Sequence, residues 1–282
     1  MIGVLATFAL REALRRRVFA VVAVLSVGFL ALYALGVWQA FDIADDFGGG
    51  FRGIDAQVVT GATMFGLSMF GTLFLGAVLG VFLTLGVVRG DAERGLLQPV
   101  LARPVSRDAL LGARLLAAGA VCGGYTLALY CAAMAITGAI GGWWPDRPFS
   151  TGLSLALAVI VLSAISLAGS VVMSAAANGI AVFMTFGAGL TAGLLGQIGR
   201  ALNSDTLTRV SDVTTWLLPF EALYQSALAD LTAETVGFTR FALQLGPLGG
   251  AREGGPLLYV WAIAYVAVVM VAAAAAFRRR DV

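Results

Sequence analysis

The sequence contains no lysine and no histidine, so all 18 of its basic residues are arginine. A phosphate-binding P-loop ends in Gly-Lys-Ser or Gly-Lys-Thr, and this chain cannot form one. Ser–His and Cys–His nucleophile pairs, Ser–Lys dyads, Schiff-base lysines and histidine metal ligands are excluded for the same reason. We therefore expect no catalytic residue, no metal site and no cofactor site in this chain.

Charge and cysteine are also scarce. Charged residues make up 12% of the 282 residues and hydrophobic residues 60%, whereas an ordinary soluble domain has about 25% and about 45–50%. Cys122 and Cys131 lie in one apolar run, and on a single helix they would be too far apart for a disulfide bond. This composition is typical of a chain whose main solvent is lipid.

Six apolar segments are long enough to cross a membrane as helices: 18–38, 60–88, 109–140, 152–176, 179–199 and 256–277. The stretch 148–199 has no charged residue and is too long for one span. We place its break at Ala177-Asn178-Gly179, because Asn-Gly favours a turn or a helix cap. The sequence thus predicts an all-α polytopic membrane protein with six transmembrane helices. Glycine pairs such as Gly76–Gly80 and Gly189–Gly193 favour close helix packing, within one subunit or between subunits.

The arginines indicate the orientation, because cytoplasmic loops carry an excess of positive charge. They concentrate before the first span, between the second and third spans, and after the sixth. Both termini are therefore predicted to be cytoplasmic. Residues 1–17 form either a short interfacial helix or a plain basic flank, and residues 18–282 form the six-span domain.

The segment between the second and third spans has an ordered arrangement of charge. Residues 89–114 read RGDAERGLLQPVLARPVSRDALLGAR, with five arginines and three acids. Glu93 and Arg94 precede an apolar stripe, Pro104 stops that element, and Ser106 is a good N-cap for the third span. An ordinary cytoplasmic loop would explain the arginines but not this order. We predict a short charged element that faces the cytoplasm.

Glu93 to Gly112 read E-x-G-x-L-x-x-x-L-A-x-P-V-S-R-x-x-L-L-G. This run resembles the cytoplasmic loop between spans two and three of type-2 ABC exporter permeases, and the six-span layout agrees with it. The resemblance implies a coupling loop over residues 89–107, which docks into a separate ATPase subunit. Pro99 leaves the extent of its helix open. The candidate coupling residues are Asp91, Glu93, Arg94, Gly95, Leu97, Arg103, Pro104, Ser106 and Arg107.

The same resemblance implies the partners. The ATPase subunit would bind ATP and Mg²⁺, and a second permease copy or a sister permease would complete the membrane core. The expected location is a bacterial or archaeal cytoplasmic membrane, in contact with lipid and with no nucleic acid.

The outer segment 200–255 contains SDVTTWLLPFEALYQSALADL at 211–231. A helix is predicted from Pro219, because proline favours the first helical position. Phe220, Leu223 and Tyr224 open its apolar face, and Glu221 lies away from that face. We expect this helix to rest in the outer interface or to re-enter the membrane, as a structural lid or as a shield for an exit pathway. Its candidate residues are Pro219, Phe220, Glu221, Leu223 and Tyr224.

Two other functions remain open. One is a non-transporting membrane subunit that assembles a complex or signals. The other is an ion-coupled secondary transporter, which usually needs ionisable residues inside its spans. The span centres hold none, although backbone carbonyls of broken helices could bind Na⁺. The substrate and the choice between homodimer and heterodimer also stay open.

Overall fold

The computed structural model describes residues 17–46, 55–85, 107–237, 239 and 251–279. All regular structure in these ranges is helical. Six helices are long and apolar enough to cross a membrane: α2 (Arg17–Asp46), α3 (Ala56–Thr84), α6 (Arg107–Gly141), α7 (Pro148–Val172), α8 (Ala175–Ala201) and α12 (Gly255–Arg278). This confirms the predicted all-α fold with six candidate transmembrane helices. The orientation of the termini stays a prediction.

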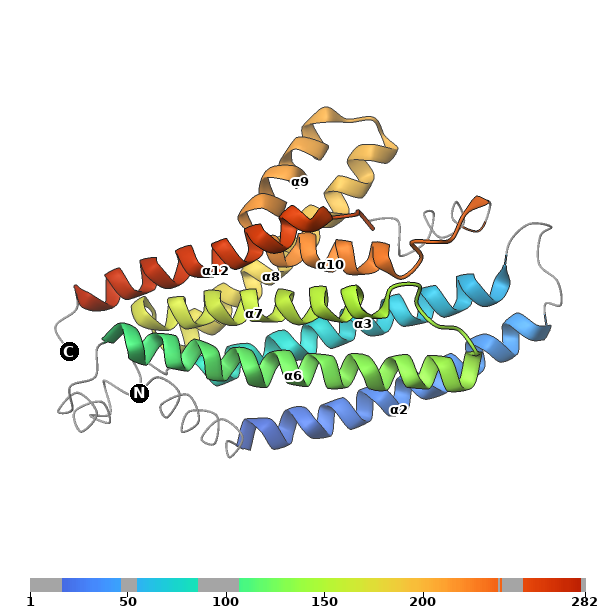
Figure 1. Cartoon of the computed structure of the whole chain (residues 1–282), viewed down its shortest axis with the longest axis horizontal. Coiled ribbons are helices and arrows are strands. Elements are labelled where there is room, and N and C mark those ends of the chain that lie inside the picture. Colours follow the sequence, from blue (N-terminus) through green and yellow to red (C-terminus); the bar gives the residue numbers. More distant parts are fainter. Residues whose placement is uncertain (1–16, 47–54, 86–106, 238, 240–250, 280–282) are drawn as a thin grey trace.

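The long helices alternate in direction, so their ends collect at two ends of the bundle (Figure 1). The start of α6 and the last turn of α12 meet at one end, where Asp108 pairs with Arg278. The end of α3 and the start of α8 lie at this same end. We call it the arginine end. The α6–α7 connection, residues 142–147, lies at the opposite end of α6.

The first residues of several helices explain where those helices begin. Asp55 caps α3, because its carboxylate accepts hydrogen bonds from the backbone nitrogens of Gln57 and Val58 at 3.0 and 3.2 Å. Pro148 and Pro219 open α7 and α10 (Pro219–Asp230), where the missing amide proton costs nothing. The predicted start of the outer helix at Pro219 therefore agrees with the structure.

The predicted break at Ala177-Asn178-Gly179 is wrong. Helix α7 ends at Val172, and α8 begins at Ala175 with Ser174 as its N-cap. Ser174 Oγ accepts from the backbone nitrogen of Ala177 at 3.5 Å. Asn178 is buried inside α8, where its side chain bonds to α7 instead of capping a helix.

Helices α3 and α7 form the centre of the bundle. In their most apolar stretches 67% and 72% of the residues are buried, against 17% in both α2 and α12. Close packing at the centre depends on small residues: a Cβ added to Gly76 would strike Val159 of α7. The glycine pairs of α3 and α8 thus serve packing within this chain. The outer faces of α2 and α12 remain apolar and exposed, as expected for helices that border lipid.

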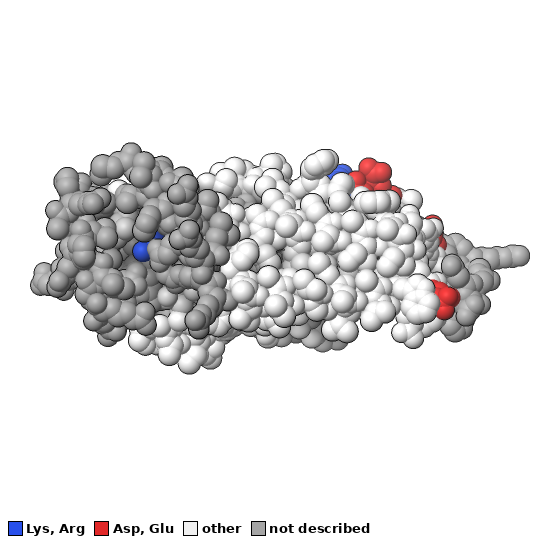
Figure 2. Space-filling model, turned by 90° about the horizontal axis from the view of Figure 1, so that it is seen from below, with Lys and Arg blue, Asp and Glu red and all other residues white. Residues whose placement is uncertain are grey.

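The distribution of charge agrees with a membrane-embedded bundle. Figure 2 shows a broad band without Lys, Arg, Asp or Glu across the middle of the visible face, with acidic residues toward one end. Exposed Leu, Val and Ile side chains occur along α2, α8 and α12. Such a surface would be unstable in water over this length, so a lipid environment is its natural solvent.

The outer segment contains a second helix that the sequence did not predict, α9 (Asp205–Leu217). It pairs with the end of α8, and together they project from the bundle (Figure 1). Helix α10 takes a different course, because it packs against α7 and also contacts α12. Of the described part of this segment, α9 thus lies outside the bundle and α10 inside it.

Candidate functional site

The candidate coupling residues Asp91, Glu93, Arg94, Gly95, Leu97, Arg103, Pro104 and Ser106 lie outside the described residues. Arg107 is the first residue of α6, and its side chain is not described. Their predicted role stays a prediction. The structure does describe the two helix ends that flank residues 86–106, namely the end of α3 and the start of α6.

Buried polar groups bond the end of α3 to α7, and the same residue of α7 is bonded to α8. Thr84 Oγ1, in the last residue of α3, donates to Ser166 Oγ of α7 at 2.6 Å. Asn178 Nδ2 of α8 donates to the backbone oxygen of Ser166 at 2.8 Å. All three side chains are 0–2% exposed. Buried polar groups of this kind fix one relative position of their helices, because each bond lost would leave a polar atom in an apolar interior.

Gly169 of α7 makes room for this Thr84–Ser166–Asn178 cluster. A Cβ at Gly169 would collide with Asn178 Oδ1, so only glycine fits on α7 at this level. Asn178 Oδ1 itself is buried and has no hydrogen-bond partner among the groups described. The cluster therefore holds one unsatisfied acceptor, which lowers the cost of rearranging it.

The start of α6 is fastened to a different helix. Arg278, in the last turn of α12, donates from Nε to Asp108 Oδ1 at 3.1 Å and from Nη2 to Asp108 Oδ2. Both side chains are exposed, so the pair contributes little to stability. Its two hydrogen bonds link the start of α6 to the last turn of α12. The two ends that flank residues 86–106 thus connect to α7, α8 and α12.

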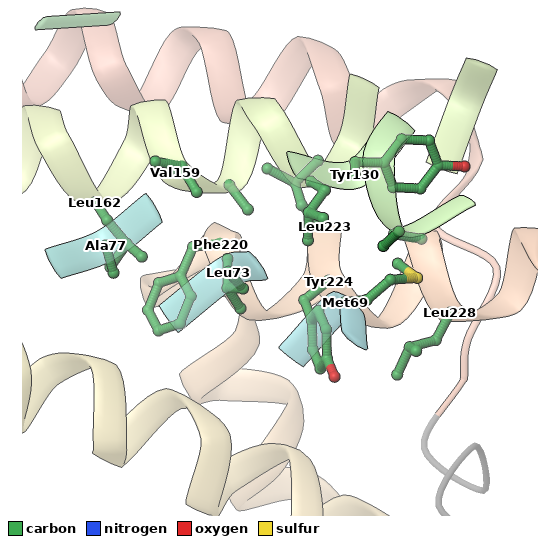
Figure 3. Packing of buried hydrophobic residues seen from close by; sticks show 14 of the residues in the cluster. Met69, Leu73, Ala77, Tyr130, Val159, Leu162, Phe220, Leu223, Tyr224 and Leu228 are labelled. Carbon is green, nitrogen blue, oxygen red and sulfur yellow. The ribbon is translucent and has the colours of Figure 1, made fainter. Parts of the chain in front are cut away.

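Helix α10 supplies the second candidate site. Phe220 and Leu223 are fully buried, and Tyr224 is nearly so. Figure 3 shows them facing Met69 and Leu73 of α3 and Val159 of α7. Phe220 also stacks on Phe186 of α8, with 5.8 Å between ring centroids. The predicted apolar face of this helix therefore lies in the core of the bundle.

Glu221 lies away from the apolar face of α10, but it is also buried, which the sequence did not indicate. Glu221 is only 4% exposed and lies against Gly193 of α8, where a Cβ would collide with its Oε1. Gln225 Nε2 donates to Glu221 Oε1 at 3.1 Å, and Oε2 is buried with no partner among the described groups. Burial raises the pKa of Glu221 to about 8. At neutral pH the carboxyl is therefore mostly protonated.

The sequence missed this because α10 is covered on two sides. Its apolar face packs on α7, while Glu221 and Gln225, four residues apart, face α8. The signal was the glycine spacing at Gly189, Gly193 and Gly196, which creates room for side chains of another helix.

The first site could transmit a movement between helices, and the second could bind and release a proton. Within the described ranges there is no group of three or more His, Cys, Asp and Glu side chains that could hold a metal ion. What the arrangement offers is a set of bonded helix ends at the arginine end and one buried, protonatable carboxyl on α10.

The family model described as "ABC-2 family transporter protein" matches residues 4–282. No curated protein matches the chain in a sequence comparison.

Proposed function

The chain belongs to the ABC-2 family of transporter proteins, and we propose that it is the permease of an ATP-driven exporter whose ATPase is a separate subunit. The observation that carries the proposal is the family match, which includes residues 86–106 and nearly the whole chain. A multi-pass membrane protein with no P-loop lysine requires such a partner for ATP hydrolysis. The ATPase would bind ATP and Mg²⁺, and this chain would hold neither.

The proposed contact with the ATPase is the coupling loop, residues 89–107. Glu93, Arg94 and Arg103 supply charge and Leu97 an apolar anchor, so the loop suits a groove with an apolar floor and charged rims. Gly95 and Pro104 would mark the limits of the element, and Ser106 and Arg107 lead into α6. A charge-assisted contact from Glu93 would be worth about 1.5–3 kcal/mol when partly buried.

The bonded helix ends support this mechanism. A movement of the loop displaces the end of α3 and the start of α6, since both are covalently continuous with it. Thr84 would carry the first displacement to α7 and α8, and Asp108 would carry the second to α12. Closure of the ATPases on ATP would in this way reach three other helices, α7, α8 and α12, through two short routes.

The proposal includes a dimer and a location. A second permease copy or a sister permease would complete the membrane core, and the apolar outer faces of α2 and α12 leave surface for lipid and for a second subunit. The arginine distribution supports an orientation with both termini on the ATPase side. The proposed transport is export across a bacterial or archaeal cytoplasmic membrane.

Glu221 favours a second candidate function, proton-coupled transport. A buried carboxyl with an unpartnered oxygen and a pKa of about 8 can gain and lose a proton near neutral pH. In such a transporter a Glu221→Gln variant would lose transport. In an ATP-driven permease the same variant would retain ATP-dependent activity, because ATP hydrolysis would act through the coupling loop, residues 89–107, and not through Glu221.

The ATPase partner can be sought directly. We would place a photo-crosslinking amino acid at Gln98, in the coupling loop, and at the exposed Glu234 as a matched control. Crosslinking in membranes should capture a P-loop ATPase from position 98 and none from position 234. Absence of any such partner at position 98, or equal capture at both positions, would contradict the proposal.

A further inference from the structure

A hollow of about 400 Å³ lies between α9, α10 and the start of α12. Its volume falls in the range of small-molecule sites. Two tryptophans and two leucines provide most of its apolar wall, and acidic and amide groups complete it; the residues that matter here are Trp216, Trp261, Leu257, Leu258, Glu253 and Gln225. None of the proposed ATP-coupling steps uses this hollow.

The wall of the hollow is held in place by specific contacts. The backbone nitrogen of Arg252 donates to the backbone oxygen of Gln225 at 3.3 Å. The backbone nitrogen of Gly254 donates to Ser226 Oγ at 3.4 Å. A Cβ at Gly254 would strike Leu258 and Ser226, so the chain passes closely over α10. Residues 252–254, just before α12, are therefore held against α10 by hydrogen bonds and close packing. These contacts fix one wall of the hollow.

The two tryptophans come from different helices and meet at the hollow. Their ring centroids lie 5.4 Å apart, with the planes inclined at 60°. Trp261 Nε1 donates to the backbone oxygen of Trp216 at 3.2 Å, which fixes the orientation of the Trp261 ring. Trp216 is 63% exposed. Aromatic residues often anchor a protein at the membrane interface, but a simple anchor does not need a pair that lines a cavity.

The charge around the hollow is unequal. Arg252 Nη1 pairs with Asp212 Oδ1 at 2.7 Å, so these two charges compensate each other. Glu253 has no ion-pair partner in the part of the chain that the structure describes. Of the described lining residues, Asp212 and Glu253 are acidic and Arg252 is basic, so the described lining has a net negative charge and also contains two indole rings. Indole faces attract cations, and quaternary ammonium groups are bound in proteins by this combination.

We propose that this hollow binds an organic cation with an apolar or aromatic body. The cationic centre lies between the indole rings and Glu253, and the apolar body covers Leu257 and Leu258. An anion is disfavoured, because the guanidinium of Arg252 is already engaged by Asp212. The cation is either a free small molecule or the choline headgroup of a lipid, since both share this chemistry.

Tetraphenylphosphonium and tetraphenylborate test the proposal, because they have nearly the same size and shape and opposite charge. The full chain in phosphatidylglycerol nanodiscs is titrated with each ion, and empty nanodiscs give the partition background. Saturable binding of the cation above background, with none for the anion, is expected. Equal binding of both ions, or no saturable binding of either, would overturn the proposal.

Three variants locate the site. Trp261→Leu removes one ring and should weaken cation binding roughly tenfold. Glu253→Gln removes one acidic group of the lining at an exposed position and should weaken cation binding about fivefold. Trp38→Leu is the matched control, because Trp38 is 61% exposed on α2 and lies outside the hollow. Loss of binding in the Trp38 variant, or its retention in both others, would contradict the location.

Replacing phosphatidylglycerol with phosphatidylcholine distinguishes the two sources of the cation. Because the two lipids differ in surface charge, each affinity is expressed relative to the cation concentration at the bilayer surface, taken from empty nanodiscs of the same lipid. On that scale, a weaker affinity for tetraphenylphosphonium in phosphatidylcholine assigns the site to a choline headgroup, and an unchanged affinity assigns it to a free cation. Because binding is measured on the permease alone and without ATP, its failure would leave the ATP-driven mechanism standing, and failure of that mechanism would leave this site standing.

Discussion

Glu221 is the residue whose environment differs most from its sequence expectation. A glutamate is costly to bury as a charged group, and the described residues provide a single donor, Gln225, for its two oxygens. The raised pKa, to about 8, is the direct result of that burial. The carboxyl is thus kept neutral at the cost of a proton uptake that an exposed glutamate would not show.

This proton uptake predicts a pH dependence of stability. The folded-state pKa of Glu221 is about 8 and its ordinary value is 4.5, so the folded state holds the proton more tightly than the unfolded state. The favourable contribution of protonated Glu221 to the free energy of unfolding is fully present below about pH 4.5, and it is lost as pH rises through about 8. Glu221→Gln should remove this slope, because the amide cannot titrate.

Thermal unfolding of wild type and Glu221→Gln in nanodiscs from pH 5 to pH 9 measures the difference. The variant should gain on the wild type as pH rises. Histidines, which titrate in this window, are absent from the chain, so the slope is easy to assign. Glu234→Gln is the control, since Glu234 is exposed and should leave the slope intact. Parallel curves for all three proteins would refute the buried, protonated state.

Some of the α10 site follows from sequence and some does not. The start of α10 at Pro219 could be predicted, because proline is favoured in the first turn of a helix. Phe220, Leu223 and Tyr224 show a helical period, so their burial could be predicted. Glu221 could not be placed, because its environment comes from Gly193 on a helix that ends before α10 begins. The spacing of apolar residues along a helix identifies its apolar buried face. In α10 a second, polar face that contains Glu221 is also buried, and apolar spacing does not indicate it.

Among the helices, the junction of α3, α7 and α8 shows how a polar cluster can replace a turn signal. Asn178 looked like part of a turn, because Asn-Gly pairs usually are. Its amide instead reaches Ser166 on α7, and Ser174 takes the capping role. The number and type of the long helices were predictable from apolar length. Their exact junctions depended on tertiary contacts that no local pattern contains.

The same cluster gives a prediction for Thr84. Thr84→Val keeps the shape of the side chain and removes the bond to Ser166, so it should lower the free energy of unfolding by about 1 kcal/mol. Thr72→Val is a matched control on α3, because the buried Thr72 hydroxyl has no hydrogen-bond partner within the ranges that the structure describes. Removing that hydroxyl should be neutral or stabilising.

Unfolding in a titration with denaturing detergent compares the two variants with wild type. The expected order of stability places Thr84→Val below wild type and Thr72→Val at or above it. An equal loss in both variants would mean that the Thr84 bond has no special role in joining the helices.

For the molecule as a whole, the arrangement of helix ends decides which segments can act together. Four helix ends lie at the arginine end of the bundle: Thr84, Arg107, Ala175 and Arg278. Glu234 follows α10, and its backbone nitrogen donates to Asp146 in the α6–α7 connection. A partner that binds residues 86–106 therefore acts next to four helices. The hollow beside Trp216 and Trp261 is lined by α9, α10 and the start of α12, far along the chain from that loop.

The orientation prediction follows from this arrangement and from the positive-inside rule. After replacement of Cys122 and Cys131, a Glu234→Cys variant should react with an impermeant maleimide in intact cells. An Arg279→Cys variant should react only after permeabilisation. Both positions are exposed, so access is decided by the side of the membrane. The reverse pattern would put the coupling loop outside and exclude contact with a cytoplasmic ATPase.

The ATPase activity of the partner, measured with and without the permease in nanodiscs, is the most direct check on the proposed energy coupling. The permease should stimulate hydrolysis, and Glu93→Ala should weaken its association with the ATPase about tenfold or more, because a charge-assisted contact is worth about 1.5–3 kcal/mol. Membrane insertion of the variant should stay normal. Hydrolysis that is unaffected by the wild-type permease, and equal for wild type and Glu93→Ala, would contradict coupling through this loop.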